Sequence, residues 1–105
     1  MAKIIISIKA KISFRSFLEY SSQEFGRKAL LRFREKVTKK ISQLQNYPLS
    51  CSPEPLLSKY PIQFRSCVIQ KPIKMVYHFV EESDTLYIDN FWDMRRNPDA
   101  LKGDI

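Results

Sequence analysis

Residues 62–98 read IQFRSCVIQKPIKMVYHFVEESDTLYIDNFWDMRRNP and carry the pattern that decides the fold. Three apolar segments, 62–69, 73–80 and 85–92, are rich in β-branched and aromatic residues, as strands are. The connections between them hold three and four residues, which is short enough for antiparallel neighbours and too short for a crossover. This stretch therefore predicts a three-stranded antiparallel meander.

The pairing of the first two strands is expected to follow from a tight turn at residues 71–72, Lys-Pro. Only one register gathers the apolar faces of both strands on the same side of the sheet, where helices can cover them. That expected register pairs Phe64 with Phe79, Ser66 with Tyr77, and Val68 with Met75.

The opposite face of the same two strands is predicted to be polar and basic. Side chains alternate between the faces of a strand, so the expected register places four reactive side chains together. These are Arg65, Cys67, Lys74 and His78. The third strand leads directly to Arg95 and Arg96, so a cationic surface is expected at this end of the sheet, and it calls for an anionic partner.

The N-terminal half predicts a strand and two helices. Residues 3–9, KIIISIK, favour a strand because the run is short and β-branched. A helical spacing starts near Ser13, and Ser21–Glu24 matches a capping box that should begin a second helix. The second helix is expected from about residue 26 to residue 45, with apolar residues at a 3.6-residue period. The predicted class is α+β: an N-terminal strand, an antiparallel two-helix hairpin and a three-stranded antiparallel meander, within one domain spanning residues 1–105.

Composition indicates a globular basic protein. Of 105 residues, 44% are hydrophobic and 28% charged, which argues against disorder. No apolar run reaches the roughly 18 residues of a membrane span, and lysines interrupt the start of the chain, so neither a membrane segment nor a signal peptide is expected. A cytoplasmic location is the expectation. Residues 47–61 hold four of the six prolines and are expected to form a loop.

The net charge of +7 is concentrated in one half of the chain. Residues 1–46 hold eleven Lys/Arg and three Asp/Glu, or +8, whereas residues 47–105 hold seven and eight, or −1. A solvated helix face explains part of this excess, and an anionic partner, either nucleic acid or an acidic protein segment, would explain the rest.

The two cysteines are expected to be reduced. A cytoplasmic protein rarely keeps a disulfide, so Cys51 and Cys67 are interpreted as structural thiols. They lack CxxC spacing and the chain has a single histidine, so no metal site is expected, and no cofactor.

Three segments resemble a known family. They are FGRKALLRFREKVTKKISQLQNYP, IKMVYHFV and DNFWDMRRNPDAL, and with the order of elements they cover nearly the whole chain. The chain resembles the RelE/ParE superfamily of toxins from bacterial type II toxin–antitoxin modules, and its double arginine is most similar to ParE-like plasmid stabilisation proteins. RelE-like members cut mRNA on the ribosome, whereas ParE-like members poison DNA gyrase.

The resemblance implies a catalytic set only if the chain is RelE-like. Arg65, Lys74 and Arg95 would then stand where those enzymes place cationic residues that stabilise the charge on the transferred phosphate. Two positions depart from the pattern, because Cys67 replaces a basic residue and Leu101 lies near the expected tyrosine. The proton-transfer set is therefore incomplete.

His78 is a candidate for the missing acid or base. Imidazole exchanges protons near neutral pH, and His78 shares the predicted face with Arg65 and Lys74. The alternative for His78 is a packing or hydrogen-bonding role. For the two cations the alternative is a solvated strand face, and for Arg95 and Arg96 it is a frayed, charged tail.

Trp92, Arg95 and Arg96 are the predicted target-binding residues. Aromatic side chains at the end of the third strand invite base stacking, but core packing or docking of a partner helix is the favoured interpretation of Trp92 or its neighbour Phe91. An acidic antitoxin is expected to dock on the basic half of the chain. The residues named for that contact are Arg32, Arg34 and Lys36.

The leading functional hypothesis is a ParE-like toxin that inhibits growth by binding gyrase and is neutralised by a cognate antitoxin. The first alternative is a RelE-like ribosome-dependent endoribonuclease acting on mRNA. The second alternative is a small basic binding module without toxicity.

Overall fold

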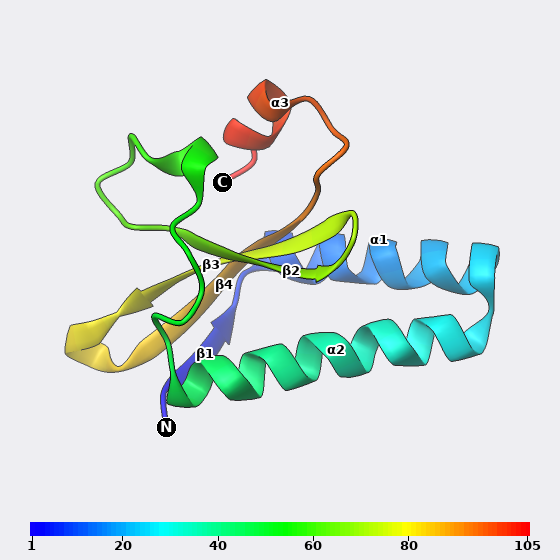
Figure 1. The fold of residues 1–105 in the computed structure, drawn as a ribbon, viewed down its shortest axis with the longest axis horizontal. Helices are drawn as coiled ribbons and strands as arrows, with labels where there is room; N and C mark the ends of the chain where they lie inside the picture. Colours follow the sequence, from blue (N-terminus) through cyan, green and yellow to red (C-terminus); the bar gives the residue numbers. More distant parts are fainter.

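A four-stranded mixed sheet, with a helical hairpin on one face, forms the body of the protein (Figure 1). The computed structural model describes residues 1–105. The strand order is β1-β4-β3-β2, with β1 parallel to β4 and the other pairs antiparallel. The elements are β1 (Lys3–Ile6), α1 (Ile8–Phe25), α2 (Arg27–Asn46), η1 (Pro55–Leu57), β2 (Arg65–Gln70), β3 (Ile73–Val80), η2 (Glu81–Ser83), β4 (Thr85–Asp93) and α3 (Pro98–Lys102). The predicted α+β class, with its N-terminal strand, helix pair and antiparallel meander, is confirmed.

The hairpin begins and ends at different residues from those predicted. Ser7 caps α1, because its Oγ accepts a hydrogen bond from the Ala10 amide at 3.0 Å and donates one to the Asp89 carbonyl at 2.8 Å. The first strand therefore ends at Ile6 rather than residue 9. The predicted capping box at Ser21–Glu24 is wrong, because those residues lie inside α1. The turn is made by Gly26 at φ +86°, a left-handed conformation that favours glycine.

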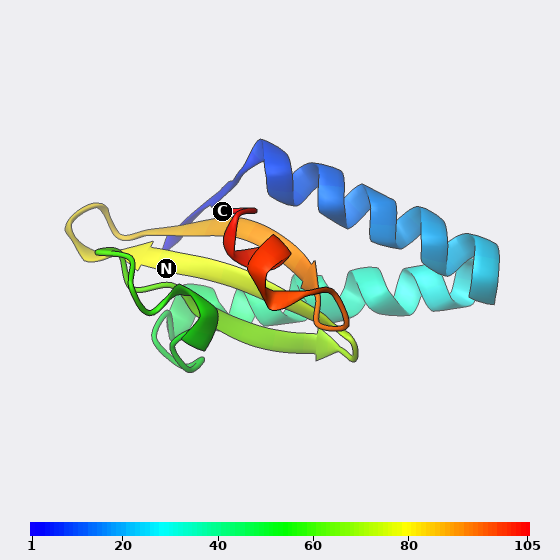
Figure 2. The same cartoon turned by 90° about the horizontal axis from the view of Figure 1, so that it is seen from above.

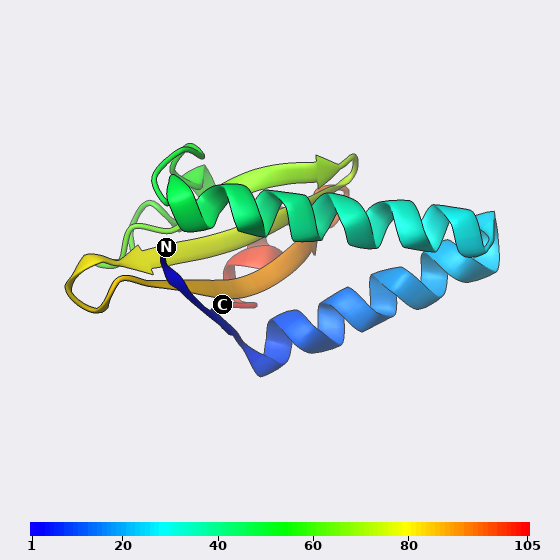
Figure 3. The ribbon, with the colours of Figure 1, turned by 90° about the horizontal axis from the view of Figure 1, so that it is seen from below.

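The main core lies between the hairpin and the sheet. Residues of α2 spaced by one or two turns, Phe33, Val37 and Leu44, are buried on this side, which confirms the helical period. Phe14 of α1 packs between Phe33 and Phe91, with ring centroids 5.9 and 5.3 Å away. Figure 3 shows α1 and α2 crossing this face of the sheet and continuing past its end.

A second, smaller core covers the opposite face of the sheet. The loop with η1 and the C-terminal α3 lie over this face, as Figure 2 shows from above. Five buried residues from the loop, the strands and α3 form this cluster: Leu57, Phe64, Val76, Trp92 and Leu101. The face predicted to be a polar working surface is therefore largely a packed interface.

The predicted register of the first two meander strands is wrong by one residue. Cys67 pairs with Met75 and Val68 with Lys74, and β2 starts at Arg65 rather than residue 62. A one-residue slip exchanges the faces of a strand, so Cys67 lies in the main core while Val68 is 49% exposed. The strand has apolar residues on both faces, so periodicity alone could not choose between the registers.

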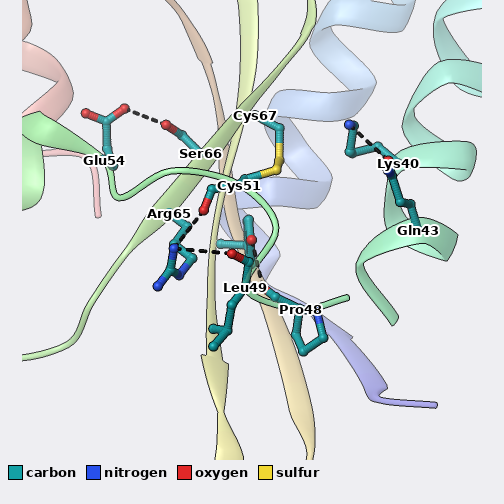
Figure 4. Close-up of a disulfide and its surroundings, with 10 residues drawn as sticks. Lys40, Gln43, Pro48, Leu49, Cys51, Glu54, Arg65, Ser66 and Cys67 are labelled. Carbon is teal, nitrogen blue, oxygen red and sulfur yellow. Dashed lines mark hydrogen bonds between the residues drawn. A yellow bond between two sulfur atoms is a disulfide. The ribbon is translucent and has the colours of Figure 1, made fainter. Parts of the chain in front are cut away.

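The cysteines form a disulfide, so the prediction of reduced thiols is wrong. Cys51 and Cys67 are joined with their Cα atoms 5.8 Å apart, and no cysteine is free. Figure 4 shows the bond tying the loop to β2. The pairing depends on the observed register, which turns Cys67 toward Cys51 in the loop.

None of the helices is both long and apolar enough to cross a bilayer.

Candidate functional site

Arg65 holds the loop and does not share a face with Lys74. The register pairs Arg65 with Tyr77, whose side chain lies on the hairpin face of the sheet. Its guanidinium donates hydrogen bonds to the Cys51 carbonyl at 2.7 Å and to Gln63 Oε1 at 3.1 Å. Figure 4 shows the side chain reaching toward the loop at the carbonyls of Leu49 and Cys51. The predicted convergence of Arg65 with Lys74 and His78 is therefore wrong.

Lys74 lies beneath the loop in an ion pair with Glu54. The Glu54 side chain is 0% exposed, and its carboxylate also accepts hydrogen bonds from Ser66 Oγ at 3.0 Å and the Leu56 amide at 2.7 Å. The ammonium of Lys74 stands 5.3 Å from the centre of the Trp92 ring, a cation–π contact.

Arg95 is clasped by a carboxylate two residues before it. Its Nε and one terminal nitrogen donate to the two oxygens of Asp93 at 3.0 and 2.7 Å. Hydrogen bonds from Arg95 lower the pKa of the Asp93 carboxyl, and the same bonds raise the pKa of the arginine. Arg96 is held more loosely, 3.6 Å from Asp104.

His78 is paired with Asp89. Its Nδ1 lies 2.7 Å from Asp89 Oδ2, and its ring stacks on Tyr87 with centroids 4.8 Å apart. The edge of Phe64 packs against the same ring. Burial raises the pKa of the Asp89 carboxyl, and the hydrogen bond from His78 opposes that rise. His78 and Lys74 do lie on the same face of β3, as predicted, but each side chain has its own carboxylate partner.

Trp92 is a core residue. Its side chain is 1% exposed within the second core, beside the equally buried Leu101. The core-packing interpretation is confirmed for Trp92 and also for Phe91, which is 3% exposed. The Trp92 ring is thus not at the surface, where a target or a nucleobase could contact it. Its Nε1 is buried without a hydrogen-bond partner.

The basic face of α2 is solvent-exposed as predicted. Arg32, Arg34 and Lys36 are all exposed, and only Lys36 has a side-chain partner, the amide oxygen of Gln70 at 2.9 Å. The predicted antitoxin-binding role of these residues stays a prediction. The arrangement offers three free or loosely held cations to an acidic surface.

Three carboxylates that are not among the predicted site residues decide the chemistry of this region. Glu54, Asp89 and Asp93 respectively hold Lys74, His78 and Arg95. Only the last pairing had a local signal, an acid two residues before an arginine at the end of a strand. The loop carboxylate stands 20 residues from its lysine, so no spacing rule could find it. The proposed catalytic roles stay predictions, but each cationic group is already partnered.

Comparisons with known proteins show a similarity of fold. No family model matches this chain, and no curated protein matches it. Among solved structures, the solution structure of a conserved hypothetical protein from Helicobacter pylori, HP0892, is similar at a TM-score of 0.52 and 17% sequence identity. The alignment covers 90% of this chain and 97% of that protein. At this identity the similarity shows a shared fold.

Proposed function

We propose that this chain is the toxin of a bacterial type II toxin–antitoxin module and acts, in the ParE-like manner, by binding a protein target. The three segments that resemble the RelE/ParE superfamily and the matching order of elements support the family. DNA gyrase is the target to test first, because it is the target of ParE-like members. Recognition of a protein needs no catalytic set.

The partnering of the cations is the observation that favours binding over cleavage. A nuclease of the RelE type needs cationic groups that converge on one phosphate as charge develops there. Here Lys74 is bound to a fully buried carboxylate and Arg65 to loop carbonyls, whereas Arg95 keeps free donors beside its pair with Asp93. Moving Lys74 onto a substrate would leave Glu54 as an unpaired charge at a fully buried position, which is costly.

The second core further argues against a cleavage site on this face of the sheet. Leu57 and Phe64 from the loop and Leu101 from α3 pack there against the strands. A ribonucleotide would have to displace this packing to reach Lys74. A protein partner can instead use the exposed surfaces of the helices and the strand ends, without disturbing the core.

An acidic antitoxin is the proposed neutralising partner. The first 46 residues carry a net charge of +8, and most of them lie in the hairpin. Complementary charge accelerates association and selects the correct partner. The exposed side chains Arg32, Arg34 and Lys36 on α2 are the proposed centre of that contact.

The toxin proposal is tested by inducing the chain alone in bacteria. Growth, plasmid supercoiling, chromosomal breaks and the 5′ ends of mRNA are followed together. Growth arrest with altered supercoiling and DNA breaks is the expected result. Codon-phased mRNA cuts would replace this proposal with the nuclease alternative. Unimpaired growth at confirmed expression of folded protein would leave the non-toxic binding module.

The antitoxin contact is tested by charge reversal. The triple variant Arg32→Glu, Arg34→Glu and Lys36→Glu should lose co-purification with the proposed acidic antitoxin. The matched control reverses three exposed lysines at the other end of the basic half, Lys3, Lys9 and Lys11. Equal retention by both variants would count against a contact centred on α2, and equal loss would indicate that only the total charge matters.

A further inference from the structure

A cleft opens where the end of the hairpin overhangs the turn between β2 and β3. Its volume is about 460 Å³, within the range of ligand-binding clefts. Figure 3 shows the hairpin continuing past the β2–β3 turn, which leaves this flank of the helices without a strand against it. The apolar walls come from both sides of the gap: Phe17, Tyr20, Phe25, Phe33, Pro72 and Ile73.

Two aromatic side chains at the mouth of the cleft are exposed without an evident role in folding. Tyr20 is 51% and Phe25 69% exposed, and their rings meet edge to face at 6.3 Å. Half or more of each side chain is therefore in contact with solvent. Exposed aromatic side chains that line a cleft are typical of binding sites.

Arg95 offers an unused pair of donors at the same cleft. A guanidinium has five N–H donors, and Asp93 takes one from Nε and one from a terminal nitrogen. The end of the guanidinium, formed by the two terminal nitrogens, keeps a free fork that matches a second carboxylate. The side chain is 68% exposed and held in position by Asp93, so little ordering is needed on binding.

Lys71 supplies the remaining charge. It lines the cleft, is exposed, and makes no hydrogen bond or ion pair within the chain. The cleft has a net charge of +1 beside its apolar walls, because it is lined by two cations, Arg95 and Lys71, and one anion, Asp93. That balance suits a single carboxylate. A nucleic acid strand would call for several surplus cations along its backbone, which the cleft does not have.

We propose that this cleft binds a segment of a partner protein in which a large apolar or aromatic side chain stands next to a carboxylate side chain. The apolar group fills the space between Phe17 and Ile73 and packs on Tyr20 and Phe25. The carboxylate bonds to the free fork of Arg95. A free small molecule fits less well, because a small-molecule site buries most of its ligand whereas these aromatic walls stand half open. The inference concerns binding and holds whether or not the chain is a toxin.

The test uses a synthetic peptide that has tryptophan between glutamates and carries a fluorescent label. Affinity is measured by fluorescence anisotropy, and the site is mapped by peptide-induced shifts in the ¹⁵N–¹H spectrum of the full chain. Control peptides replace the glutamates with glutamine or the tryptophan with alanine, and a labelled single-stranded RNA tests the nucleic acid alternative. Saturable binding with shifts at the cleft is the expected result.

Matched variants locate the contact on the protein. Phe25→Ala and Arg95→Gln should each weaken peptide binding about tenfold, as the loss of an anchor residue does. Tyr47→Ala removes an aromatic side chain of nearly equal exposure, 68%, and Lys59→Gln removes an exposed cation outside the cleft. Both controls should bind as the wild type does.

Several results would overturn the proposal. These are no saturable binding, equal affinity for the glutamine peptide, shifts confined to the outer face of α2, or tighter binding of the RNA. Equal effects of the test and control variants would also overturn it. Because the measurement is direct, its failure leaves the toxin proposal standing, and absence of growth arrest leaves the cleft proposal standing.

Discussion

Replacement of Lys74 by methionine tests the buried ion pair with Glu54, which favours a toxin that binds a protein over one that cleaves RNA. The variant leaves the Glu54 carboxylate with two hydrogen-bond donors, the Leu56 amide and Ser66 Oγ, at a site that is 0% exposed. Breaking a buried pair by removing one partner costs about 3 to 5 kcal/mol. We expect the lower end, about 3 kcal/mol, because those two donors remain. A domain of this size has a stability of about 5 to 15 kcal/mol, so the variant should still fold.

A double-mutant cycle isolates the pair from the packing around it. Glu54→Gln removes the buried charge, so the double variant Lys74→Met with Glu54→Gln should recover about 2 kcal/mol relative to the sum of the single losses. Urea unfolding at neutral pH, followed by fluorescence of the buried Trp92, measures each of the four free energies. A loss below about 1 kcal/mol for Lys74→Met, or strict additivity in the cycle, would refute the reasoning that this pair anchors the loop.

The same double variant discriminates function. A toxin that acts by binding its target through exposed surface should still arrest growth when Lys74 and Glu54 are both neutral, because neither side chain is exposed. A nuclease that needs Lys74 should lose its activity although the fold is restored. Growth arrest that disappears in a variant shown to be folded would therefore contradict the binding proposal.

Three further predictions concern stability. The disulfide closes a loop of 16 residues, so Cys51→Ser should lower the free energy of unfolding, measured in urea, by about 3 kcal/mol. Reductant should lower the free energy of unfolding of the wild type by the same amount and leave that of the variant unchanged. Unequal losses would contradict a stabilising role of the disulfide. Ser7→Ala should cost about 1 kcal/mol in thermal melts, whereas Ser16→Ala, exposed in the middle of α1, should cost little; equal losses would count against the cap. Because the pKa of Asp93 is lowered in the folded state, its bond to Arg95 stabilises the fold at pH values above 3.8, the ordinary pKa of the carboxyl. This stabilisation is lost as the pH falls through the lowered pKa of the folded state. Arg95→Gln should therefore be less stable than the wild type at neutral pH and converge with it in strong acid; a constant difference at all pH values would reject this linkage.

Much of the fold could be predicted because the signals are local. The buried positions of α2 recur at the period of a helix, and the second meander strand, 73–80, lies where predicted with its faces correctly divided. The first meander strand failed because both of its faces carry apolar residues. Val68 and Cys67 compete for the core there, and the disulfide with Cys51 accompanies the register that buries the cysteine.

The candidate site was less predictable than the fold. The cations could be recognised in the sequence but their partners could not, and a cation's chemistry depends on its partner. Asp93 lies two residues from Arg95, within reach of a local rule, whereas Glu54 reaches Lys74 only because the loop folds back over the sheet. The surface that was predicted to bind a polyanion thus consists largely of ion pairs within the protein.

By itself the sequence determined the α+β class, the helical hairpin and the meander, because backbone geometry turns side-chain periodicity directly into helices and strands. Only the tertiary structure decided which face β2 presents, that Cys51 meets Cys67, and that Glu54 holds Lys74. The reason is that burial and charge pairing depend on distances between segments far apart in the chain. Such distances are set by the packing of the whole domain and leave no trace in local spacing.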